Sequence, residues 1–414
     1  MMTEQLLLAA AVLMAVAALA VGLARRLGLG SIAALLAVGM VLGPHSPLPL
    51  FTSHVGDLQA IGAIGVVLLL FLVGLDAQPA RLWLVRNWVL GFGSVEFLAA
   101  AGVIAGFLLA MSQVNWQSAL VIGLGLAMSS DAVALPILQA RHEEDSPHGR
   151  ITIAADILQA VIIIPILAAI PLLDTMSSAG RESLNILKVL QVLAALAGVW
   201  LLGRVLLPYW LRLIARDAGD VHYAVVVLAA VFAAAWAMET VGISMALGAF
   251  LMGVLLSTSA FASQVRAAVL PAREVLLGVF FVAVGMAIDL KEAVTFRAEL
   301  LFYLPAVLLL KVAVAYGAAR AFRLEPRQAL LAGLFLMPLD EIGYVIFASA
   351  NAHGLLSARA YTLALLAISF SFLVSPLAIH LALELGKLMP AAAAGGARAP
   401  AAGVRRLPPS GPGR

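Results

Sequence analysis

The stretch GLGLAMSSDAVALP, residues 123–136, places polar side chains inside an otherwise apolar segment. Ser129, Ser130 and Asp131 follow one another, and Pro136 comes soon after them. An aspartate at the centre of a membrane helix costs about 2.5–3.5 kcal/mol on insertion scales. Because such acids usually face a bundle interior or a water-filled cavity, Asp131 is a candidate functional residue in an interrupted helix.

The composition excludes a soluble globular protein. The 414 residues are 63% hydrophobic and 11% charged, and the mean hydropathy is +1.07. Soluble domains carry roughly 25% charged residues, so we expect an integral membrane protein. Cysteine is absent, which excludes disulfides, thiolate chemistry and cysteine-ligated metals.

The distribution of apolar segments predicts an all-α membrane protein. A helix needs about 20 apolar residues to cross the hydrocarbon core, and breaks at glycine, proline and charge delimit thirteen candidate spans. The spans are 5–24, 31–44, 58–75, 88–111, 117–139, 150–173, 186–207, 221–238, 242–257, 274–289, 299–319, 328–350 and 359–385. They predict a membrane domain over residues 1–388, followed by a tail over 389–414 whose Ala/Pro/Gly/Arg-rich composition is typical of disorder.

The basic residues predict an orientation. With the N-terminus outside, 19 of the 25 Lys and Arg residues fall in inner segments and 5 in outer segments, which leaves Lys311 inside a span. This asymmetry is typical of an inner-membrane protein with an odd number of crossings and a cytoplasmic C-terminus. The first residues lack a basic n-region and a distinct cleavage site, so they do not predict a cleaved signal peptide.

A second interrupted span repeats the pattern of the first. In LFLMPLDEIGYVIF, residues 334–347, Pro338 precedes Asp340 and Glu341, and Gly343 follows. Proline removes a backbone donor, and broken backbone at bilayer depth is tolerated only where protein buries it or a wet cavity lies beside it. Two such spans, the fifth and the twelfth, indicate a transporter binding site.

Few charged residues lie inside the spans, so each is a candidate for a role. They are Glu96, Asp131, Asp156, Glu239, Lys311, Asp340 and Glu341. Lys311 lies too deep to reach water easily, so it is expected either to pair with a carboxylate or to lose its proton. The sequence leaves the role of Glu96 undecided, and Glu239 lies near a span end. The loop RHEEDSPHGR (141–150) is predicted to be a solvated run of charged residues, and a pH sensor is the alternative.

Four further segments carry a resemblance to a known family. RLGLGSIAALLAVGMVLGP (26–44), IGVVLLLFLVGLDAQPARLW (64–83), ALGAFLMGVLLSTSAF (246–261) and LLGVFFVAVGMAIDL (276–290) resemble the Kef-type members of the monovalent cation:proton antiporter-2 family. The resemblance runs from about residue 5 to 385. It implies a thirteen-helix inverted-repeat fold with a core domain of two crossing broken helices, a dimerisation domain, and exchange of Na⁺ or K⁺ for H⁺ by an elevator-like movement.

The family's site residues carry over only in part. Ser129, Ser130, Gln159, Lys311 and Glu341 match the pattern that the resemblance implies. Asp131 stands in place of a threonine, Leu339 and Asp340 replace two glycines, and Ala160 stands where the family carries its ion-binding aspartate.

Two carboxylates are candidates to replace the missing aspartate. Asp131 lies on the broken helix, and Asp156 lies one helical turn before Ala160 on the same face. Asp131 is the first choice with Asp156 assisting, Asp156 as the primary carboxylate is the second, and altered or lost ion coupling is the third.

The mechanism expected at this site is competition between a proton and a monovalent cation for one carboxylate. Burial raises the pKa of such a carboxylate and the charge of Lys311 lowers it, so the balance can bring the pKa near the working pH. Ser129, Ser130 and Gln159 would add polar ligands, while Glu341 and Asp340 would neutralise a helix N-terminus or take part in a proton step. We expect a non-enzymatic carrier without cofactor or resident metal, in contact with lipid and not with nucleic acid, and the resemblance implies a homodimer. A cation channel and a coupling-deficient or regulatory homologue are the rival readings, and the choice between Na⁺ and K⁺ is open.

Overall fold

The computed structural model describes residues 2–26, 31–44, 55–77, 87–111, 114–177, 186–214, 220–288 and 294–388. Within these ranges every regular element is a helix, and the only β-type pairing is one isolated antiparallel bridge between Ser129 and Leu339. The predicted all-α class is therefore confirmed. The tail predicted over 389–414 lies outside the described residues.

The helices of the first half follow the predicted spans closely. They are α1 (Met2–Arg26), α2 (Ser31–Leu42), α3 (Val55–Asp76), the π-helical stretch η1 (Asn87–Gly93), α5 (Ser94–Met111), α6 (Trp116–Ala127), α7 (Asp131–Ala140) and α8 (Pro147–Ser177). The fifth predicted span is divided into α6 and α7, as its serines and aspartate indicate. At the start of α6, the side chain of Asn115 caps the helix by accepting a 2.7 Å hydrogen bond from the backbone N–H of Ser118.

The second half contains the other interrupted span. Its elements are α9 (Ile186–Leu201), the π-helical stretch η2 (Leu202–Leu206), α10 (Leu207–Ile214), α11 (Asp220–Thr240), α12 (Met245–Ser257), α13 (Ala262–Ala287), α15 (Arg297–Ala321), α16 (Pro326–Phe335), α17 (Ile342–Ala352) and α18 (Ala358–Leu388). Pro326 occupies the first turn of α16, where its missing N–H would have had no partner. The twelfth predicted span is divided into α16 and α17.

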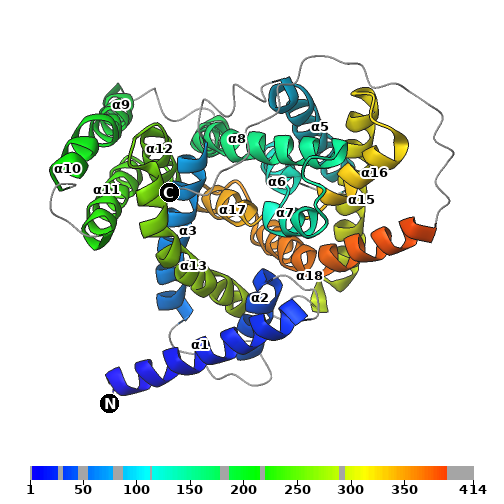
Figure 1. The fold of residues 1–414 in the computed structure, drawn as a ribbon, viewed down its shortest axis with the longest axis horizontal. Helices are drawn as coiled ribbons and strands as arrows, with labels where there is room; N and C mark the ends of the chain where they lie inside the picture. Colours follow the sequence, from blue (N-terminus) through cyan, green and yellow to red (C-terminus); the bar gives the residue numbers. More distant parts are fainter. Residues whose placement is uncertain are drawn as a thin grey trace.

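The described residues form four hydrophobic clusters, and the two largest of them divide the bundle. The larger core draws its side chains mainly from α5, α6, α8, α15, α17 and α18, and the smaller one from α3 and α9–α13. Figure 1 shows α9, α10 and α11 on one side of the molecule and α5, α15 and α16 on the other. Helices α3, α12 and α13 contribute residues to both cores, so they form the boundary between the two parts.

Small residues bring the boundary helices into close contact. A Cβ atom placed on Gly253 of α12 would lie 2.0 Å from the carbonyl oxygen of Phe71 in α3. In the same way, a Cβ atom on Gly39 of α2 would lie 2.1 Å from the carbonyl oxygen of Val282 in α13. Since lipid offers no hydrophobic driving force between membrane helices, close approach at small residues supplies the packing that holds them together.

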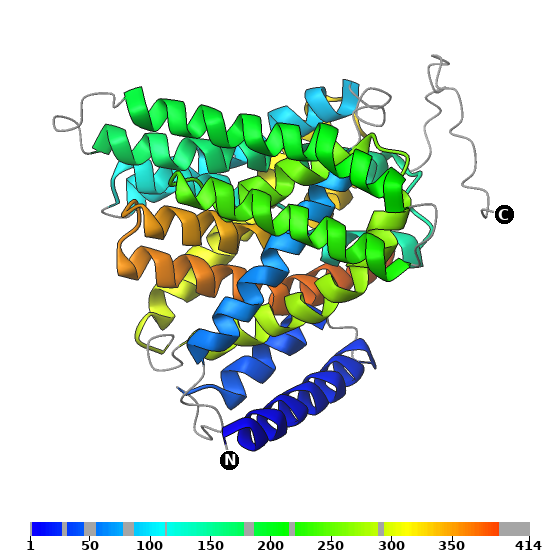
Figure 2. The same ribbon diagram turned by 90° about the vertical axis from the view of Figure 1, so that its left-hand side faces the viewer.

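The described helices are consistent with a multi-pass membrane protein. Six stretches are long and apolar enough to cross a membrane: Trp88–Met111, Pro147–Pro171, Leu193–Leu213, Ala262–Met286, Arg297–Ala321 and Ala358–Glu384. Figure 2 shows helices packed side by side, with α1 at one edge of the bundle. The count of thirteen crossings stays a prediction.

The tenth predicted span was misplaced at its start. The sequence suggests a span over 274–289, whereas α13 begins at Ala262 and continues through Pro271. Arg266 and Arg273, which fall between the predicted spans 242–257 and 274–289, therefore lie on a helix. Arg266 forms an ion pair with Asp76 at the end of α3, so its charge is compensated by a residue distant in sequence, which hydropathy cannot report.

The loop between α7 and α8 is more ordered than a solvated charge run. His148 is only 3% exposed, stacks on Phe335 of α16, and lies 2.5 Å from Oε1 of Gln328 and 3.1 Å from a carboxylate oxygen of Glu143. Burial pushes the pKa of Glu143 upward, but hydrogen bonds from Arg141 and His148 outweigh it and leave that pKa below its ordinary value. His148, at the start of α8, thus contacts both this loop and α16.

Candidate ion-binding site

The two interrupted spans cross at their breaks. Between α6 and α7 the chain is extended at Met128 and Ser130, and Ser129 forms the antiparallel bridge with Leu339, which lies between α16 and α17. The N–H of Ser130 donates a 3.2 Å hydrogen bond to the carbonyl of Pro338. Each break therefore supplies partners for the backbone groups of the other, which is what non-helical backbone at membrane depth requires.

Neighbouring side chains fix this crossing. Ser129 Oγ donates a 2.7 Å hydrogen bond to the carbonyl of Leu336, and the Ser129 N–H donates a 2.6 Å bond to Oε1 of Gln159 on α8. The N–H of Leu339 donates to Ser371 Oγ on α18 at 3.0 Å. Of the predicted site residues, Ser129 and Gln159 thus hold the backbone of the crossing, with Gln159 joining it to α8, while Ser371 joins it to α18.

Lys311 lies beneath the crossing and is fully buried. Its ammonium group donates a 2.6 Å hydrogen bond to the carbonyl of Met128 and a 3.4 Å bond to the carbonyl of Pro338. These carbonyls follow the C-terminal ends of α6 and α16, where the helix dipoles concentrate negative charge. Within the described part of the chain, Lys311 has no carboxylate partner in an ion pair, so two helix ends take the place expected for a carboxylate.

The N-terminal ends of the other two half-helices carry acids. Asp131 is the first residue of α7, and Glu341 immediately precedes α17. Asp340 Oδ1 accepts a 2.9 Å hydrogen bond from the N–H of Ile342, and Ser130 Oγ donates a 3.4 Å bond to Oε2 of Glu341. Positive helix ends thus meet carboxylates, while negative helix ends meet the ammonium of Lys311.

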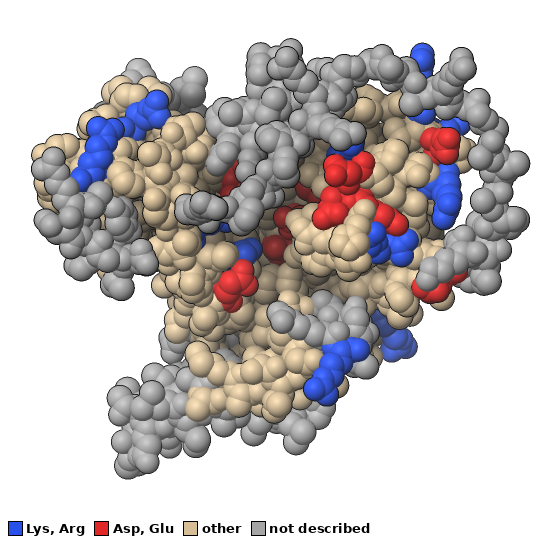
Figure 3. Space-filling model, in the orientation of Figure 1, with Lys and Arg blue, Asp and Glu red and all other residues tan. Residues whose placement is uncertain are grey.

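A polar cavity of about 170 Å³ opens beside the crossing. It is lined on one side by Ser129, Asp131, Asp156, Gln159, Ala160, Asp340, Glu341 and Ile342, and on the other by Leu69, Leu72, Val73 and Asp76 of α3 and Arg266, Leu270 and Arg273 of α13. Figure 3 shows acidic side chains within a recess between the α3 and α13 side and the α7 side. The cavity therefore lies between the two parts of the bundle.

The carboxylates at this cavity differ in exposure. Asp131 is exposed and Asp156 is partly exposed, whereas Asp340 and Glu341 are only 7% and 5% exposed. One oxygen of Asp156, Oδ1, is buried without a hydrogen-bond partner in the described structure. Asp131 thus offers an exposed carboxylate at the cavity, and Asp156 offers one oxygen without a hydrogen-bond partner in the described structure.

Three charged residues at the cavity were not predicted as site residues. Asp76 and Arg266 form their ion pair there, and the charge of Arg273 acts on both Asp131 and Glu341. Arg266 and Arg273 are seven residues apart, or two helical turns, so they share one helix face. This spacing was the available signal, but Pro271 between them suggested a loop.

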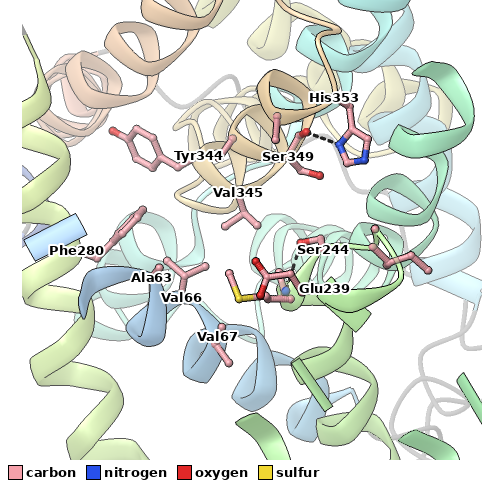
Figure 4. A pocket seen from close by; sticks show the side chains of 16 residues that line it. Ala63, Val66, Val67, Glu239, Ser244, Phe280, Tyr344, Val345, Ser349 and His353 are labelled. Carbon is pink, nitrogen blue, oxygen red and sulfur yellow. Dashed lines mark hydrogen bonds between the residues drawn. The ribbon is translucent and has the colours of Figure 1, made fainter. Parts of the chain in front are cut away.

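A second, largely apolar cavity of about 400 Å³ lies at the far side of α17 from the polar one. Figure 4 shows Glu239 and Ser244 on one wall and Ser349 and His353 on another, with Tyr344 and Phe280 nearby. His353 Nδ1 lies 2.8 Å from the carbonyl of Ser349. Helices α3 and α13 line both cavities, and α17 contributes Tyr344, Val345 and Ser349 to the apolar one.

Two interrupted helices that cross beside a charged cavity define a membrane transporter of the broken-helix kind. The chain belongs to the sodium/hydrogen exchanger family, whose transmembrane model matches residues 11–385. The family consists of transporters, and the sequence resemblance to its Kef-type members is confirmed.

Two curated relatives are named glutathione-regulated potassium-efflux system protein KefC. The one from Cronobacter sakazakii is 36% identical over 389 residues, which cover 93% of this chain and 62% of that protein. The one from an Enterobacter species is 34% identical over 383 residues, which cover 92% of this chain and 61% of that protein. The chain thus spans about three fifths of the length of these relatives.

The fold is similar to that of a solved antiporter. The structure of the sodium proton antiporter MjNhaP1 from Methanocaldococcus jannaschii at pH 8 matches with a TM-score of 0.67 and 18% identity, over 92% of this chain and 99% of that one. At this identity the likeness shows the fold alone.

Proposed function

We propose that the chain exchanges a monovalent cation for protons across the membrane, with both ions competing for carboxylates at the helix crossing. The observation that carries the proposal is the polar cavity, which Asp131 and Asp156 both line and where one oxygen of Asp156 is buried without a hydrogen-bond partner in the described structure. An acid at this depth is costly unless it is protonated or neutralised by a nearby cation. A proton and an alkali cation are therefore alternative ways of satisfying the same group.

Asp131 is the proposed primary carboxylate, with Asp156 assisting. Asp131 is the more exposed of the two and stands at the positive end of α7, so it can exchange ligands with water in the cavity. Ser129 and Gln159 hold the crossing beside it. Lys311 neutralises the negative helix ends, while Asp340 and Glu341 neutralise a positive one. No covalent chemistry is required.

Potassium is the cation that we test first, because the relatives about one third identical are named for potassium efflux, and sodium is the second. We further propose an inner-membrane location with the N-terminus outside, which rests on the 19-to-5 asymmetry of basic residues. A homodimer is proposed from the family resemblance alone.

Purified protein in proteoliposomes that carry a pH-sensitive dye tests the proposal. Addition of K⁺ or Na⁺ outside acid-loaded vesicles should release protons from the lumen in proportion to cation uptake. Asp131→Asn should abolish this exchange, and Asp156→Asn should weaken it. The partly exposed Glu299, which pairs with Arg359 at 2.6 Å, supplies the matched control Glu299→Gln, for which unchanged exchange is expected.

The same assay separates the rival functions. A channel would pass the cation without proton counterflow when the membrane potential is clamped, and a coupling-deficient or regulatory homologue would move neither ion. If Asp156→Asn abolishes exchange while Asp131→Asn retains it, the order of the two carboxylates is reversed. If neither substitution affects exchange, the cavity is not the site.

A further inference from the structure

Glu96 is the acid that the exchange site as described above does not use. It lies in the first turn of α5, directly after the π-helical stretch η1. Its side chain is 0% exposed, and neither carboxylate oxygen has a hydrogen-bond partner in the described structure. The Gln159 amide is the nearby donor, but it makes no hydrogen bond of ordinary geometry to Glu96, and a carboxylate shielded from water in this way is costly to bury. We therefore expect the carboxyl group of Glu96 to be either protonated or stabilised by a nearby positive charge.

The surroundings of Glu96 contain other unpartnered polar groups. Its electrostatic neighbours are Lys311 of α15 and Asp156 of α8, and the amide of Gln159 is close to it. Gln159 Nε2 and Asp156 Oδ1 are themselves buried without partners. Two other elements that pack against α5, η1 and α6, carry no titratable side chain. Glu96, Asp156, Gln159 and Lys311 thus form one polar cluster, in which Glu96 and Lys311 are fully buried and Asp156 is partly exposed.

The cluster communicates with the polar cavity. Asp156 and Gln159 line that cavity, and both also face Glu96. Lys311 has three N–H donors, of which two are directed to the carbonyls of Met128 and Pro338. The third donor has no described hydrogen-bond partner, so it is available to an ionised Glu96. The protonated acid and the carboxylate stabilised by Lys311 are two states that the surroundings can accommodate.

We propose that Glu96 is a proton-binding residue of the exchange cycle, located behind the cation site. This inference rests on the proposed function. A cation in the polar cavity neutralises part of the acidic field there, which makes ionisation of Glu96 less costly, and Glu96 then releases its proton past Asp156 towards the cavity. The reverse step takes a proton from water and restores the carboxylic acid, which weakens cation binding. Proton and cation are thereby coupled through charge, and the coupling is reciprocal.

Replacement of Glu96 by glutamine in the same proteoliposomes tests the inference. Glu96→Gln keeps the shape but cannot ionise, so we expect cation-driven proton release to fall at least tenfold and the pH dependence of cation binding to weaken, since Asp131 and Asp156 still bind protons. Glu299→Gln is again the matched control, since it removes a partly exposed glutamate from the first turn of α15, where it pairs with Arg359. If the wild type exchanges ions and the Glu96→Gln variant does so equally well, the role of Glu96 is overturned and the proposed function stands. Absence of exchange in the wild type would overturn both.

Infrared difference spectroscopy supplies a second measurement that does not require transport. Titration of K⁺ onto the wild-type protein should remove a protonated carboxylic acid carbonyl band and release a proton to a dye in the medium. That band should be absent in Glu96→Gln and displaced in frequency in Glu96→Asp. If the band remains at full intensity and position in both variants, the proton is held by another acid and Glu96 is not the binding residue.

Discussion

Replacement of Lys311 by methionine is the sharpest test of how the crossing is held together. The substitution keeps an unbranched apolar chain and removes the ammonium group, which donates to the carbonyl oxygens of Met128 at 2.6 Å and Pro338 at 3.4 Å. A hydrogen bond with a charged partner contributes about 1.5–3 kcal/mol net. Since the second bond is long, we expect the loss to be about 2–4 kcal/mol in total.

The assay is reversible unfolding in mixed micelles, followed by tryptophan fluorescence and reported as a free energy of unfolding. Leu308→Met is the matched control, because Leu308 lies on the same helix, is 6% exposed and accepts a change of shape for less than about 1.5 kcal/mol. If Lys311→Met unfolds no more easily than Leu308→Met, the ammonium does not stabilise the half-helix ends. That result would refute the electrostatic account of the crossing.

A double-mutant cycle extends this test to Glu96. Lys311→Met leaves Glu96 without its nearest positive charge, so adding Glu96→Gln should restore part of the lost free energy. No ion pair within 4.0 Å joins the two side chains in the described structure, and two unit charges at that distance interact by about 4 kcal/mol at an effective dielectric constant of 20. We therefore expect a coupling energy below about 4 kcal/mol. A coupling energy of zero would show that Glu96 and Lys311 do not interact.

Three further predictions concern other contacts. Gly125→Ala should lower the free energy of unfolding by about 1–3 kcal/mol, because the new Cβ would lie 2.4 Å from the buried ring of Phe347. Gly102→Ala is the control and should not be destabilising, because the space around Gly102 is open. Equal unfolding free energies for the two variants would contradict this prediction. Arg273→Gln should lower the apparent KM for the cation about two- to tenfold, because it removes a positive charge that acts on Asp131, and an unchanged or higher KM in the flux assay would exclude that role. Because the pKa of Glu143 is lowered in the folded protein, ionised Glu143 should stabilise the α7–α8 loop fully above the ordinary pKa of a glutamate, and this stabilisation should be lost as the pH falls through the lowered pKa. Hydrogen exchange at the Gly149 amide should therefore become faster at acid pH in the wild type and not in Glu143→Gln.

The sequence alone located the interruptions of the helices. Ser129, Asp131 and Pro338 stand out because hydropathy and helix propensity are local properties, and a polar or helix-breaking residue in an apolar run is visible without knowledge of its neighbours. The same locality explains the error at α13. Pro271 and two arginines are loop signals in a local window, and only the ion pair between Arg266 and Asp76 shows why a helix can carry them.

What the sequence determined, then, is an all-helical membrane chain with two broken spans and a small set of acids and one lysine at depth. The tertiary structure decided which of these groups meet. It directs Lys311 to two helix ends and away from direct carboxylate pairing, brings α3 and α13 to the polar cavity, and places Glu96 beside Asp156. The physical reason is that the cost of burying a charge depends on the groups packed around it, and those groups come from helices separated by hundreds of residues in the chain.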